Sequence, residues 1–113
     1  MGKTLTVFSE AESAPTVRVS GDAERFARAH GLWDSLADIE ALILRSDPCV
    51  VLAVDVDLLS DPELEDRFVI GFNIRTDKAV TDVLAFDGAL QQAIFDRVPM
   101  EHQARFAVRF DFA

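Results

Sequence analysis

The sequence predicts an α+β domain in which helices cover one face of a mixed, mainly antiparallel sheet of four to five strands. Two segments, 67–75 and 105–112, alternate between apolar and polar residues, as strands with one buried face do. Between them, residues 78–97 place apolar side chains at helical spacing. A strand, a long helix and a strand in this order predict a crossover unit, which is right-handed if its two strands lie parallel in one sheet.

The N-terminal part of the chain supplies further predicted elements. Residues 4–8 alternate and predict a short strand, and residues 16–19 predict a second strand that completes a loose hairpin. A helix over 23–30 follows, because Ser20 can cap its start and Gly31 can end it.

The middle of the chain predicts a second helix and a central strand. Residues 35–45 carry an apolar stripe at helical spacing, and residues 49–57 begin with the continuous apolar run of a strand covered on both faces. An acidic loop over 58–66 lets this strand pair antiparallel with 67–75. The predicted order is β(β)ααββαβ, a two-layer sandwich with three helices on one face, and residues 1–113 form a single domain.

The composition excludes several classes of protein. The chain has 113 residues, with 20 acidic and 11 basic side chains and a formal charge of -9. Phosphate binding needs a basic surface, so we expect no direct contact with nucleic acid. A single cysteine, Cys49, cannot form a disulfide within the chain, and there is no apolar run of about 18 residues to span a membrane. Without a signal peptide, these features favour a bacterial, cytoplasmic protein with no membrane partner.

An acidic stretch is the most pronounced local feature. Its six carboxylates fall within twelve residues and belong to Asp55, Asp57, Asp61, Glu63, Glu65 and Asp66. Oxygen-rich clusters bind Mg²⁺ or Ca²⁺, but a calcium-binding loop needs Gly where this chain has Ser60. We therefore predict neither a metal nor a cofactor, and we interpret the last four of these acids as a solvated loop that can contact a partner.

The face of the sheet without helices is the second candidate interaction surface. The strand patterns turn four arginines away from the helices, namely Arg67, Arg75, Arg105 and Arg109. They share that face with three acids, Asp55, Asp57 and Asp111, and with five small or apolar residues, Val51, Ala53, Val69, Gly71 and Ala107. The opposite charges can pair across neighbouring strands. The face can also receive a protein partner, or a second copy that buries Val51, Ala53 and Val69 in a homodimer.

Asp87 is a candidate buried polar residue. It lies four residues after Val83 and three before Leu90, within a predicted apolar stripe that consists of Val80, Val83, Leu84, Leu90, Ile94 and Val98. A carboxylate that faces a core must be paired or hydrogen-bonded, unless the helix is rotated slightly outward. The neighbouring Gly88 costs about 1 kcal/mol of helix propensity, which indicates close packing or a bend.

The residues that commonly catalyse reactions do not form a recognisable constellation. His30 and His102 lack partners at zinc-site spacing, and no serine stands in a nucleophile turn, so we predict no catalytic residue. We expect a small, acidic, non-enzymatic protein that binds, regulates or inhibits another protein. A sharper version is a phage or mobile-element inhibitor that mimics the charge of nucleic acid. The alternative is a divalent-metal-dependent phosphoryl or nucleotidyl transfer enzyme that uses Asp55 and Asp57.

Overall fold

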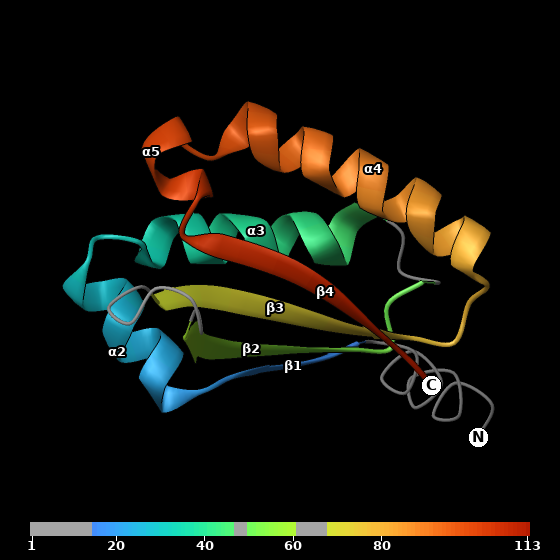
Figure 1. Ribbon diagram of the computed structural model, residues 1–113, viewed down its shortest axis with the longest axis horizontal. Coiled ribbons are helices and arrows are strands. Elements are labelled where there is room, and N and C mark those ends of the chain that lie inside the picture. The colour runs from blue at the N-terminus through green and yellow to red at the C-terminus, as the bar shows by residue number, and fades with distance from the viewer. Residues whose placement is uncertain (1–14, 47–49, 61–67) are drawn as a thin grey trace, which may run out of the picture.

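The protein folds as an α+β domain whose helices lie on one face of a four-stranded mixed sheet (Figure 1). This computed structural model describes residues 15–46, 50–60 and 68–113. The strands are β1 (Thr16–Val19), β2 (Ala53–Ser60), β3 (Phe68–Thr76) and β4 (Phe106–Phe112), and they lie side by side in that order. The helices are α2 (Gly21–Ala29), α3 (Trp33–Ser46), α4 (Val80–Arg97) and the short α5 (Met100–Gln103). The predicted strand over 4–8 lies outside the described residues.

The pairing of the strands differs in part from the prediction. β2 and β3 are antiparallel, as expected, but β1 lies parallel to β2 and β3 lies parallel to β4. The described sheet is therefore not mainly antiparallel. The reason is connectivity, because α2 and α3 together return the chain to the end of the sheet where β1 began. A fourth helix, α5, follows Pro99 and adds to the three that the sequence predicted.

The strand alternation places the core between the sheet and the helices. Ile70, Phe72 and Ile74 of β3 have no solvent exposure, and Val54 and Val56 of β2 are buried on the same face. β4 adds three residues in register with those of β3, namely Phe106, Val108 and Phe110. Each fully buried side chain of this kind contributes about 1.5–3 kcal/mol. The predicted inward faces of these strands are confirmed.

The ends of α2 form as the sequence predicts. The Ala23 N–H donates to Ser20 Oγ at 3.1 Å, which satisfies one of the donors that a helix start leaves free. At the other end, Gly31 adopts a positive φ of 69°, a conformation that glycine takes without steric cost. The chain can therefore turn directly into α3.

The buried face of α4 is rotated relative to the predicted stripe. The buried residues are Val83, Phe86, Leu90 and Ile94, whereas Val80 and Leu84 are 58% and 63% exposed. Phe86 takes the inward position because its ring packs edge-on against Phe110 of β4, with 6.1 Å between centroids. Burying an aromatic ring here removes more apolar area from water than burying Leu84 would.

The position of the Asp87 side chain follows from this rotation of α4. The side chain is only partly buried, and Gln91 Nε2 donates to its Oδ1 at 3.3 Å. The helix is thus turned outward enough for the carboxylate to reach solvent. Asp87 therefore does not enter the core.

The short α5 is attached to α3 by a polar contact between distant parts of the chain. Ser35 Oγ, at the buried start of α3, lies 2.8 Å from His102 Nδ1. Gln103 Nε2 donates to the carbonyl of Val98 at 2.9 Å and so satisfies one acceptor at the end of α4. These contacts fix the turn from which β4 begins. No helix among the described residues has the length and apolar character needed to cross a membrane.

Substitutions at two leucines test the position of the core. Leu90 is fully buried, so Leu90→Ala should lower the free energy of unfolding by about 2–5 kcal/mol. The matched control is Leu52→Ala. Because Leu52 is 43% exposed, this substitution should lower the free energy of unfolding by about 1 kcal/mol or less. Urea unfolding followed by circular dichroism measures both. Equal losses would show that α4 does not pack as described.

Candidate functional site

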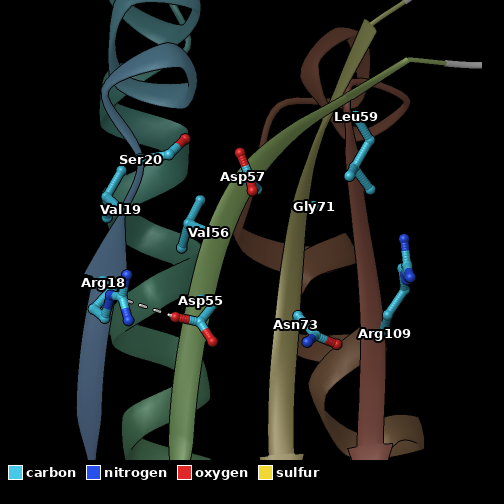
Figure 2. A pocket seen from close by; sticks show the side chains of 10 residues that line it. All are labelled: Arg18, Val19, Ser20, Asp55, Val56, Asp57, Leu59, Gly71, Asn73 and Arg109. Carbon is cyan, nitrogen blue, oxygen red and sulfur yellow. Dashed lines mark ion pairs between the residues drawn. The ribbon is translucent and has the colours of Figure 1, made fainter.

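The candidate site is the open sheet face, which is the face of the sheet opposite the helices. Figure 2 looks onto this face, with the helices behind the strands. It consists of the outward residues of all four strands, and in the described part of the chain no helix covers it. The alternation that buries one side of each strand turns the short, polar and charged side chains to this side.

A central row of four side chains crosses the whole face. The strand register places Arg18 of β1 beside Asp55 of β2, then Asn73 of β3, then Arg109 of β4 (Figure 2). Arg18 Nε lies 3.9 Å from Asp55 Oδ1, and both side chains are more than half exposed. An exposed pair of this kind contributes about 0–1 kcal/mol, so the row is available for other contacts.

A hollow of about 480 Å³ lies around this row. Its lining residues come from every strand and are Arg18, Val19, Ser20, Asp55, Val56, Asp57, Leu59, Gly71, Asn73 and Arg109. Gly71 is essential to its shape, because the Leu59 side chain lies directly over it. A Cβ at position 71 would stand 2.5 Å from Leu59 Cδ1, which is too close for two carbon atoms.

The charges on the open sheet face are balanced. In the neighbouring row, Arg75 of β3 stands beside Asp111 of β4. Asp57 also points outward and lines the hollow, and its Oδ1 accepts from the Leu58 N–H at 2.9 Å. The described strands thus present three arginines, Arg18, Arg75 and Arg109, and three aspartates, Asp55, Asp57 and Asp111. The acidic excess of the chain does not reside here.

Two of the four arginines predicted for this face lie on it. Arg75 and Arg109 stand on β3 and β4 with outward positions. Arg105 differs from the expectation, because it precedes β4 and its guanidinium lies 5.3 Å from the ring centroid of Phe26 in α2. Val51 also differs, since it precedes β2 and is buried in the core. Arg67 and the predicted loop acids Asp61, Glu63, Glu65 and Asp66 lie outside the described residues.

Sequence reasoning missed Arg18 and Asn73. Arg18 alternates with Val17 and Val19, which is a sufficient signal for an outward position once β1 is taken as a strand of this sheet. Asn73 stands on the outward side of the predicted strand over 67–75 but carries no charge, so nothing drew attention to it. Its importance comes from the register, which places it between Asp55 and Arg109.

Metal-binding side chains do not gather in the described part of the chain. No group of three or more His, Cys, Asp or Glu residues there is arranged to hold an ion. Asp55 and Asp57 form only a pair on one strand, with the amide of Asn73 as a further oxygen donor on the next strand. His102 contacts Ser35 instead, and His30 stacks on Phe26 with 4.2 Å between ring centroids.

A double-mutant cycle tests the contact that shapes the hollow. In the natural chain, Gly71→Ala should lower the free energy of unfolding by about 0.5–1.5 kcal/mol, because the new methyl group forces the Leu59 side chain out of its rotamer. In a Leu59→Ala background the same substitution should cost almost nothing, which gives a coupling energy of the same size, about 0.5–1.5 kcal/mol. Denaturant unfolding of the four proteins measures the coupling. Simple additivity would mean that Leu59 does not lie over Gly71.

Comparison with known proteins does not relate this site to a characterised one. Protein-family models, curated proteins and solved structures were all compared with the chain, and none of them matches it.

Proposed function

We propose that this protein is a non-enzymatic binding domain that contacts another protein through its open sheet face. The observation that carries the proposal is the central row from Arg18 to Arg109, which crosses all four strands beside a hollow that a partner side chain can enter. In this view the chain acts as a regulatory or inhibitory partner.

The character of the face favours protein as its partner. Positive, negative and amide groups alternate across the central row, and this mixture complements the mixed polar surface of a protein. A nucleic acid would bring a continuous line of negative phosphates against Asp55 and Asp57, which repel them. Asp, Asn and Gly also lose little side-chain entropy on binding, whereas long flexible side chains lose more.

The overall charge adds a preference among protein partners. The chain carries a net charge of -9, while the described open sheet face is balanced, so the negative field comes from the rest of the chain. Such a field speeds encounter with a basic protein. The sharper proposal, an inhibitor that mimics nucleic-acid charge, needs the acids from Asp61 to Asp66, which lie outside the described residues.

A pair of amide substitutions tests this proposal. Asn73→Arg places a long cation at the centre of the open sheet face, whereas Gln92→Arg makes the same chemical change on the exposed side of α4. Proteins captured from the native host should bind the natural chain and Gln92→Arg but not Asn73→Arg. Circular dichroism must show that both variants are folded. Equal capture by both variants would contradict binding through this face.

The hollow also supports a second candidate function, phosphoryl or nucleotidyl transfer with a divalent metal. Asp55, Asp57 and Asn73 all line the hollow, and carboxylate and amide oxygens are ligands that Mg²⁺ accepts. Arg18 and Arg109 flank them and could hold a phosphate by charge-assisted hydrogen bonds. In that case the metal would neutralise the phosphate charge and orient the attacking group.

Thermal unfolding in the presence of metal ions decides whether the second candidate stands. If the hollow binds Mg²⁺ or Mn²⁺, the ion should raise the midpoint temperature of unfolding. At an ion concentration one hundred times the dissociation constant, the free energy of unfolding should increase by about 2.7 kcal/mol. Asp55→Asn should abolish this rise, whereas the control Asp111→Asn, on the same face but outside the hollow, should keep it. An unchanged midpoint of the natural protein rules out the metal enzyme.

A further inference from the structure

The outer flank of α4 carries large apolar side chains that the fold does not bury. Leu84 is 63% exposed, Phe95 is 60% exposed, and Met100, just beyond the helix, is 73% exposed. Gly88 lies between Leu84 and Phe95 along the helix, and a Cβ built there would meet nothing within 4 Å. The inner face of α4 already packs against the core, so the apolar residues on this flank do not stabilise the monomer. Exposed apolar residues that gather in this way indicate a binding surface.

The outer edge of β4 lies beside this flank, and its backbone groups bond to no other described residue. Arg105 C=O accepts from Ile70 N–H, and Ala113 N–H donates to Thr76 C=O, so the odd-numbered residues of this segment bond to β3. Backbone groups alternate in direction along a strand, so Val108 and Phe110 turn their N–H and C=O outward. In the described part of the chain, no strand pairs with this edge.

A groove of about 310 Å³ joins the two features into one surface. It lies between α4 and β4 and is lined by Gln91, Ile94, Phe95, Gln103, Phe106 and Val108. At the other end of β4, Phe112 is still 49% exposed. We call the outer edge of β4 together with the exposed residues Leu84, Phe95, Met100 and Phe112 the α4/β4 margin.

We propose that the α4/β4 margin binds a second copy of this chain, with the two β4 strands antiparallel across a two-fold axis at Phe110. Charge complementarity supports this occupant and this register. Arg109 of each copy then stands opposite Asp111 of the other, which gives two favourable cross-strand ion pairs. If the axis lay at Arg109 instead, the Arg109 side chains of the two copies would stand opposite each other, and their like charges would repel.

The same register covers the exposed apolar residues. Val108 of one copy stands opposite Phe112 of the other, which buries a side chain that the monomer leaves half exposed. Phe86 of α4 contacts Phe110, where the two-fold axis lies. The α4 helices of the two copies are therefore closest to the axis near residue 86. Leu84 of one copy therefore faces Gly88 of the other, where the absence of a side chain gives it room. The surface is self-complementary, as a two-fold interface requires.

This inference does not depend on the proposed function. The margin lies at one edge of the sheet, whereas the proposed partner binds the open sheet face. A dimer would join two such faces into one surface of eight described strands, since each chain contributes the four that the structure describes. A chain that dimerises but captures no partner, or the reverse, separates the two proposals.

The first experiment measures the mass of the full chain in solution by sedimentation or light scattering. The natural protein should behave as a dimer of twice 12.5 kDa at high concentration and dissociate on dilution. Leu84→Glu should raise the dimer dissociation constant about tenfold or more, because it places a charge in the interface. The matched control is Ala89→Glu, which adds the same charge to an exposed position on the other side of α4 and should leave the dimer intact.

A charge exchange then tests the register. Arg109→Asp and Asp111→Arg should each weaken self-association, because each opposes like charges across the axis. A mixture of the two variants should form a heterodimer, since both cross-strand pairs are then of opposite charge. Val108→Pro should also give a monomer that stays folded, because its N–H points outward and is not used in the monomer.

Three outcomes would overturn the proposal. A natural chain that stays monomeric at every concentration shows that no second copy binds. A dimer that survives both Leu84→Glu and Val108→Pro uses another surface, such as the open sheet face. A mixture of the two charge variants that remains monomeric rejects the register with its axis at Phe110.

Discussion

The two-sided pairing of β3 is the constraint on which the rest of the structure depends. β3 bonds to β2 on one side and to β4 on the other, and its residues Ile70, Phe72 and Ile74 are fully buried against the helices. A slip of one residue in either ladder would turn a neighbouring strand's apolar side chains to the open sheet face. The core therefore sets the register of both neighbours. The central row of the candidate site, with Asn73 between Asp55 and Arg109, is a consequence of that register.

The elements that the sequence predicted well are those specified by local pattern. The alternation of β3 and β4 shows which residues are inward without any knowledge of the neighbours, so the outward positions of Arg75 and Arg109 could be predicted. The direction of β1 relative to β2 could not be predicted in this way. Its four residues alternate in the same way whether the strand runs parallel or antiparallel to β2. Only the path through α2 and α3 decides this, and with it the place of Arg18 in the site.

The rotation of α4 shows a different limit of sequence reasoning. Apolar residues occur on more than one side of this helix, so spacing alone does not determine which side is buried. The contact of Phe86 with Phe110 on β4 decides it and leaves Leu84 in solvent. Arg105 is similar, because its strand parity predicts an outward position while the ring of Phe26 draws its guanidinium towards α2. In both cases a contact between distant segments overrides the local pattern.

The two edges of the sheet differ in a way that bears on how the chain can assemble. β1 is only four residues long, and α2 begins directly after it at the Ser20 cap, so the edge formed by β1 offers little length for pairing. β4 is seven residues long and lies beside the apolar flank of α4. If both edges were long and apolar, copies could add one after another into an open fibre. When β4 is the only edge of the described sheet that is suited to pairing, two copies related by a two-fold axis use up that edge, and association stops at the dimer.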